Sequence, residues 1–136
     1  MATTRNSILF AESLPDDCPP IDAEPPAAQK FIRFADGPTP SAVAFLSYTG
    51  LGKPVNGGAS LCQYASCSML TVKSRGELRA LWALPKYRRF SHAMIVDVHP
   101  GAGLAKIGKK GHVDVWLYAS FNAVAAVSAT VAQGEA

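Results

Sequence analysis

The chain of 136 residues has no long apolar run, which argues against a membrane protein. A membrane-spanning helix requires roughly 18 or more predominantly apolar residues in succession, and no segment approaches that length. The N-terminal stretch offers only a three-residue apolar core between Arg5 and Glu12, which is too short for a signal peptide. We therefore expect a soluble protein that does not associate with membranes.

Catalytic and cofactor signatures are also missing. The glycine-rich loop over residues 49–60 contains Lys53, but Pro54 stands where a phosphate-binding loop needs a serine or threonine. A nucleophile elbow, a paired zinc-protease histidine motif and a kinase signature are absent, and we see no internal repeat. The sequence predicts no cofactor.

Cysteine is scarce. The three residues Cys18, Cys62 and Cys67 are an odd number in a chain long enough to fold without cross-links, which favours free thiols in a reducing compartment. We therefore expect a cytoplasmic location. A zinc site built on Cys62 and Cys67 lacks a second ligand pair, so we expect no metal, with Cys67 as a small buried hydrophobe and the other two as loop thiols.

Hydrophobic residues make up 49% of the chain and charged residues 17%, which is enough apolar material for one core. The patterns predict a single α+β domain over residues 30–136, with a mainly antiparallel, twisted sheet of four to six strands and two short helices on one side. Residues 1–29 contain five prolines, which are incompatible with a continuous helix or a central strand. We therefore expect this acidic segment to form an extended N-terminal arm.

In the first half of the domain, residues 30–35 predict a strand near the edge of the sheet, since both of its faces carry bulky groups. Residues 39–48 predict a short helix begun by Thr39 and Pro40. Residues 67–73 predict a buried strand. Ser74 and Glu77 then have the spacing of a capping box at the start of a helix that Pro85 stops.

A period of two begins at Phe90 and predicts strands over 90–98, 104–107 and 112–118, with residues 108–111 as a hairpin turn. Together they resemble a meander of neighbouring strands. The apolar tail over 121–131 is compatible with a helix or a last strand. The predicted core comprises Leu78, Leu81, Trp82, Ile95, Val113, Val115 and Leu117.

Charge is distributed unevenly along the chain. Residues 1–36 contain six acidic and three basic side chains, a net charge of −3, whereas the remainder contains ten basic and four acidic side chains, a net charge of +6. This layout favours an anionic ligand, or an arm that folds back and screens the basic part. An unevenly charged, solvated surface remains the alternative.

The basic residues concentrate between 86 and 110, next to aromatic ones, so that cations for phosphates lie beside rings for stacking. Exposed hairpin tips also carry bases merely to discourage aggregation. The predicted binding residues are Lys86, Tyr87, Arg88, Arg89, Lys106, Lys109 and Lys110.

Three histidines are the only side chains that ordinarily titrate near neutral pH. His112 and Asp114 lie two apart in a predicted strand and so share a face, where the carboxylate can orient the imidazole. In a meander, His92 lies one strand away. His92, His112 and Asp114 are therefore the candidate catalytic residues, although half-exposed strand histidines without a function are the alternative.

These features favour a bacterial-type cytosolic interaction module that binds a protein partner, or else nucleic acid or another polyanion, through the basic hairpin face. The alternative is a small, toxin-like enzyme acting on a nucleotide or RNA phosphate, with His92 and His112 as acid and base. The enzyme requires those two imidazoles within a few Å of each other, whereas the interaction module requires a contiguous exposed patch.

Overall fold

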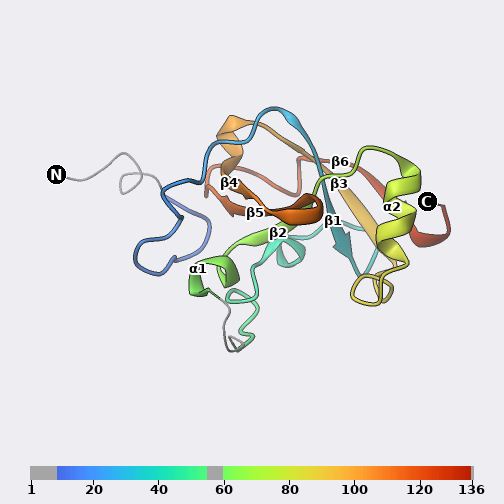
Figure 1. Ribbon diagram of the computed structural model, residues 1–136, viewed down its shortest axis with the longest axis horizontal. Coiled ribbons are helices and arrows are strands. Elements are labelled where there is room, and N and C mark those ends of the chain that lie inside the picture. The colour runs from blue at the N-terminus through green and yellow to red at the C-terminus, as the bar shows by residue number, and fades with distance from the viewer. Residues whose placement is uncertain (1–8, 55–59, 136) are drawn as a thin grey trace.

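A computed structural model describes residues 9–54 and 60–135. Figure 1 shows the sheet in the middle, with the arm and α1 at one end and α2 at the other. The helices are α1 (Leu61–Tyr64) and α2 (Arg75–Trp82), and the strands are β1 (Gln29–Ala35), β2 (Cys67–Leu70), β3 (His92–Val98), β4 (Gly103–Ile107), β5 (His112–Leu117) and β6 (Val127–Ala132). Short 3-10 turns lie at Ala42–Phe45, Pro100–Ala102, Lys109–Gly111 and Gln133–Glu135.

The six strands form one sheet in the order β4-β5-β2-β1-β3-β6, and every neighbouring pair is antiparallel. The predicted α+β class with a mainly antiparallel sheet is confirmed. Among the described residues, no helix has the length and apolar character needed to cross a membrane.

Side chains alternate between the two faces of the sheet along each strand, so both faces carry apolar residues. Other parts of the chain cover both faces. On one face, Phe31, Met94 and Val113 form a core over which Phe45 and the segment that precedes β6 pack. On the other face, Leu78 and Trp82 of α2 pack against the second core. Of the predicted core residues, Leu78, Trp82, Val113 and Val115 are buried, while Leu81, Ile95 and Leu117 are half-buried at the margins.

The edge position predicted for residues 30–35 is wrong, because β1 lies between β2 and β3 in the sheet. Its bulky residues on both faces reflect two packed faces and not an edge. The meander is wrong as well: β4 and β5 form the predicted hairpin, but β3 pairs with β1 and β6. The tail forms a strand, β6, which resolves the alternatives left for it.

The helix predicted for residues 39–48 is a 3-10 turn of four residues, Ala42–Phe45. Ser41, and not the predicted Thr39, occupies the N-cap of this turn, and its side chain forms no capping hydrogen bond. The Ser74 half of the predicted capping box is confirmed: the Ser74 hydroxyl accepts a hydrogen bond from the Glu77 backbone N–H at 3.1 Å, and α2 begins at the residue after Ser74.

The expectation of three free thiols is wrong, because Cys18 and Cys62 form a disulfide. The two residues are 44 positions apart and meet because the proline-rich segment lies back against α1. Cys67 is the free, buried cysteine that the sequence predicts. The argument for a reducing compartment rested on free thiols, so it loses its support.

The segment before β1 is tied to the domain at several points. Isolated bridges pair Phe10 with Tyr118 and Glu24 with Ala105, and Asp22 forms an ion pair with Lys106 at 3.1 Å. Ala23 packs against Leu104 and Trp116 in a third cluster of buried residues. The contacts of this segment therefore involve mainly β4 and β5.

The N-cap of α2 can be tested by substitution. Ser74→Ala removes the acceptor for the Glu77 N–H and should lower the free energy of unfolding by about 1 kcal/mol. The matched control is Ser41→Ala, which removes a hydroxyl that caps nothing and should leave stability within about 0.5 kcal/mol of the wild type. Urea unfolding followed by circular dichroism measures both, and equal losses would contradict the assignment.

Candidate functional site

A groove of about 430 Å³ opens where β1 and β2 separate. The register between these strands consists of one residue pair, Ile32 with Leu70. Beyond that pair, Arg33 and Phe34 on β1 and Ser68 and Met69 on β2 all line the groove. The site is thus a gap in the ladder between two central strands.

Arg33 fills the gap in place of the missing ladder. Its guanidinium group donates to three backbone carbonyls: those of Ser68 at 2.6 Å, Ala44 at 2.9 Å and Leu46 at 3.1 Å. A guanidinium carries donors in a rigid planar fork, which suits several acceptors at once. Arg33 therefore fixes the 3-10 turn Ala42–Phe45 against β2, where the turn forms one wall of the groove.

The opposite wall is the segment that follows α2. Its aromatic rings pack on Phe34, with the Tyr87 and Phe90 rings stacked on it at centroid distances of 4.6 and 5.9 Å. The Trp82 indole N–H donates to the Phe90 carbonyl at 2.8 Å, which anchors the segment to α2. The groove is therefore held between rigidly packed parts of the fold.

Three cations around the groove each lie over an aromatic ring. Lys53 Nζ is 5.2 Å from the ring centre of Tyr48, and Lys86 Nζ is 5.0 Å from that of Tyr87. The Arg89 guanidinium carbon is 4.2 Å from the Phe90 ring centre. Such cation–π contacts orient a cation without neutralising it.

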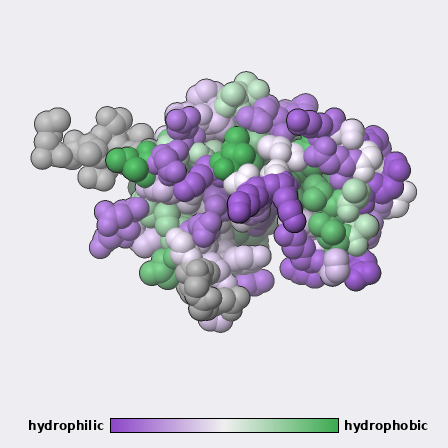
Figure 2. All heavy atoms as spheres, in the orientation of Figure 1, coloured by the Kyte–Doolittle hydropathy of each residue, from purple (hydrophilic) through white to green (hydrophobic). Residues whose placement is uncertain are grey.

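The groove cations have no carboxylate partner among the residues that the structure describes. The ion pairs recorded there involve Lys30 with Asp97, Lys106 with Asp22, and His112 with Asp114. Asp36 is the acidic residue that lines the groove, against the basic residues Arg33, Lys53, Lys86 and Arg89. The local charge therefore favours an anion. Figure 2 shows the molecular outline notched at its lower edge, with hydrophilic residues on the lobe beside the notch.

The structure assembles part of the predicted binding set. Lys86, Tyr87 and Arg89 line the groove, whereas Arg88 is exposed outside it. Lys106 lies elsewhere, paired with Asp22. The exposed residues Lys109 and Lys110 form the hairpin turn that directly precedes His112, another lining residue.

Two lining residues, Tyr48 and Lys53, were not predicted. Lys53 was considered only as part of a phosphate-binding loop, and Tyr48 only as the end of a helix. A lysine five positions after a tyrosine carries little signal by itself. Their positions depend on the 3-10 turn Ala42–Phe45. Arg33, from another part of the chain, holds that turn by hydrogen bonds.

The candidate catalytic histidines are not brought together. Registers linking His112 to Leu70, Leu70 to Ile32, and Ile32 to Ile95 place these four residues on one face, and His92, three positions from Ile95, points to the other. Strands β2 and β1 also lie between them. A meander would place one strand between the strands of His92 and His112, whereas the observed sheet places two, β2 and β1, between them.

The remaining candidates do form a pair. His112 Nδ1 lies 3.7 Å from Asp114 Oδ1, which is within ion-pair range but too long for a hydrogen bond. Asp114 is buried and accepts hydrogen bonds from Ser66 Oγ at 3.2 Å and Gln63 Nε2 at 3.4 Å. His92 Nδ1 instead lies 2.7 Å from Ser91 Oγ, and His99 accepts from the Gly101 N–H.

Within the described residues, no group of three or more histidine, cysteine or acidic side chains is arranged to hold a metal ion. Cys62, considered for zinc, is bonded to Cys18. Comparison with protein-family models, curated proteins and solved structures found no match to this chain. The function is therefore argued from the groove itself.

The role of Arg33 can be tested with Arg33→Lys, which keeps the charge but cannot donate to three carbonyls in one plane. The variant should lower the free energy of unfolding by about 1–3 kcal/mol, because half-buried carbonyls lose their donors. Arg88→Lys, at an exposed position, is the control and should change it by less than about 0.5 kcal/mol. A wild-type unfolding midpoint for Arg33→Lys would show that the fork is dispensable.

Proposed function

We propose that this chain is an interaction module that binds a polyanion, best matched by the phosphate backbone of single-stranded nucleic acid, in the groove between β1 and β2. The observation that carries the proposal is the set of three ring-oriented cations, Lys53, Lys86 and Arg89, around one groove. Positive charges that line a cleft together create an electrostatic field that attracts an anionic chain.

The geometry favours contacts with phosphates over contacts with bases. Each of the three rings already has a cation of this chain near it, and the Tyr87 and Phe90 rings also stack on Phe34. Rings occupied in this way offer little free surface to a nucleobase. We therefore expect binding that depends weakly on sequence and steeply on salt.

The location proposed for this activity follows from the disulfide. A cross-link between Cys18 and Cys62 persists where thiols are oxidised, and cytosolic reductants normally keep such pairs open. We infer that the module works where this pair stays oxidised. This inference departs from the cytoplasmic location that the sequence predicts.

The groove can be tested by fluorescence anisotropy of labelled single-stranded RNA at low and moderate salt. Arg89→Glu should weaken binding by about tenfold or more, because a charge-assisted hydrogen bond to phosphate contributes roughly 1.5–3 kcal/mol. The matched control is Arg88→Glu, the same change of charge one residue away and outside the groove, which should weaken binding by no more than about twofold.

Four outcomes of this titration are informative. A salt-dependent loss confined to Arg89→Glu supports the proposal, while equal losses in both variants mean diffuse surface charge. Binding of poly-glutamate in preference to RNA would replace nucleic acid by an acidic protein partner. No binding of either polymer at low salt would overturn the proposal.

The hairpin lysines are tested separately. Lys109 and Lys110 lie next to His112, so replacing both with glutamate should weaken RNA binding severalfold through repulsion at the groove margin. The control is Lys73→Glu combined with Arg75→Glu, an equal change of charge outside the groove lining. Unchanged affinity in the Lys109 and Lys110 variant would remove the hairpin from the binding face.

A second candidate function rests on His112, which lines the groove with Asp114 behind it. As a general base, its imidazole would accept the proton of a ribose 2′-hydroxyl as that oxygen attacks the neighbouring phosphorus. The bond from phosphorus to the 5′-oxygen of the next nucleotide breaks, the leaving 5′-oxygen takes a proton from water, and a 2′,3′-cyclic phosphate remains. Incubation of RNA with the protein should then give cleavage that His112→Asn abolishes, with DNA of the same sequence left intact. Intact RNA under conditions that saturate the groove would exclude this activity.

A further inference from the structure

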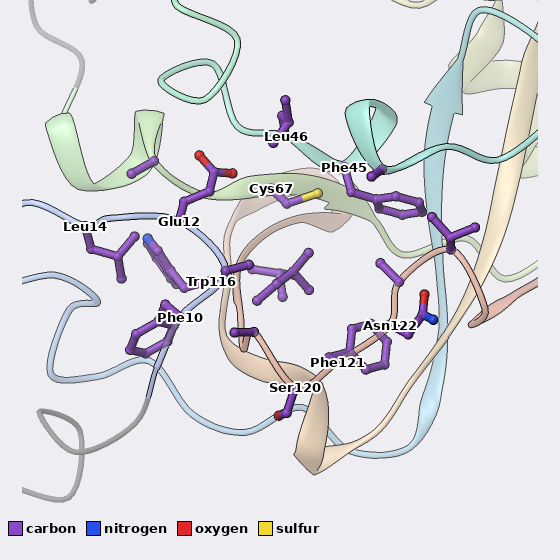
Figure 3. A pocket seen from close by; sticks show the side chains of 18 residues that line it. Phe10, Glu12, Leu14, Phe45, Leu46, Cys67, Trp116, Ser120, Phe121 and Asn122 are labelled. Atoms are coloured by element: carbon purple, nitrogen blue, oxygen red, sulfur yellow. The ribbon is translucent and has the colours of Figure 1, made fainter.

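A second cavity, of about 480 Å³, lies on the side of the 3-10 turn away from the basic groove. Figure 3 shows its walls: Phe10 and Leu14 lie beside Trp116 on one side, Cys67 and Phe45 lie above, and Phe121 lies below. Five separate parts of the chain therefore line it, namely the N-terminal segment, the 3-10 turn, β2, β5 and the segment that precedes β6.

Three polar side chains of the lining, those of Glu12, Trp116 and Asn122, form hydrogen bonds with the protein itself. Glu12 accepts hydrogen bonds from the Ser47 N–H at 3.0 Å and from the Ser47 hydroxyl at 2.7 Å. The Trp116 indole N–H donates to the Cys62 carbonyl at 3.0 Å, and Asn122 Oδ1 accepts from the Ala125 N–H at 3.0 Å. The surface left for a ligand is therefore mostly apolar.

The charge of the lining restricts the ligand further. Among the residues that the structure describes, Glu12 is the charged residue of the lining, and no lysine or arginine lines the cavity. A carboxylate or phosphate would meet a negative group with no cation to compensate it, at a high desolvation cost. The cavity therefore suits a molecule without negative charge, in contrast to the basic groove.

Cys67 contributes a thiol to this cavity, and the surroundings make it a weak nucleophile. Burial raises the pKa of the Cys67 thiol, an effect that Arg33 opposes and Glu12 reinforces. A neutral thiol is a poor nucleophile. A ligand would accordingly be held by apolar contact and not by a covalent bond.

We propose that this cavity binds a small, uncharged, apolar molecule, such as a short hydrocarbon chain or an aromatic ring system. Its volume lies within the range of roughly 300–1,000 Å³ that small-molecule sites occupy. Binding is driven by removal of the apolar surfaces of ligand and lining from water. This site is independent of the basic groove and of the polyanion proposed for it.

The N-terminal wall of the cavity depends on the disulfide. Phe10 and Leu14 precede Cys18, whose bond to Cys62 fastens this segment beside α1. Reduction removes that attachment and leaves the wall to the weaker contacts of Phe10 with Tyr118 and of Glu12 with Ser47. Binding of the apolar ligand should therefore weaken when the disulfide is reduced.

The test is a fluorescence titration of the oxidised full chain with N-phenyl-1-naphthylamine, an uncharged probe that emits strongly in apolar surroundings. We expect a saturable rise for the wild type and at least a tenfold loss of affinity for Ala119→Trp, which places a large ring at the lining. The matched control is Ala80→Trp on the exposed side of α2, which should bind as the wild type does.

A second readout does not depend on a folded variant. In wild-type protein, the probe should slow alkylation of Cys67 by N-ethylmaleimide severalfold, since Cys67 is the free thiol of the chain and lines the cavity. Reduction should lower probe affinity at least threefold while leaving RNA binding unchanged. Non-saturable fluorescence, equal binding by Ala119→Trp, or alkylation unaffected by the probe would each overturn the proposal.

Discussion

The single residue pair that joins β1 to β2 is the constraint on which the rest of the structure depends. Two central strands that part after one pair leave backbone groups without ladder partners, and groups of this kind that are shielded from water need another partner. Arg33 fills this one from within the sheet by donating to Ser68 and to the 3-10 turn. The same guanidinium thus closes the gap and positions the wall of the groove.

That 3-10 turn separates two sites of opposite chemistry. Val43 and Ala44 face the basic groove, while Ala42 and Phe45 face the apolar cavity. Consecutive residues point in different directions in so tight a turn, so one short segment can line both. Arg33 therefore binds the segment that lines both sites, whereas the Cys18–Cys62 bond holds the N-terminal segment that lines the cavity.

Local signals in the sequence were enough to predict individual helices and strands. Contacts between distant segments decide which strands lie side by side, and these were not predictable. The alternation from His92 to Val98 and the cap at Ser74 act over a few residues, so β3 and α2 were predictable. The central place of β1 and the Cys18–Cys62 bond depend on segments far apart in the chain, for which period and spacing carry no information. Lys86, Tyr87 and Arg89 were found because they lie within four residues of one another. Tyr48 and Lys53 were missed because contacts between segments far apart in the chain, including those of Arg33, bring them to the groove.

The structure also shows where the acidic and basic parts of the chain lie relative to each other. The sequence left three interpretations: a basic part open to an anion, an acidic arm that screens the basic part, or an unevenly charged, solvated surface. The arm screens one end only: Asp22 pairs with Lys106, and the Glu12 carboxylate is occupied by Ser47. The groove cations lie beyond these contacts, oriented by rings of Tyr48, Tyr87 and Phe90. Acidic residues thus hold the arm to the domain while the basic groove keeps its charge, and this division lets one small chain carry both an anion-attracting surface and an apolar cavity.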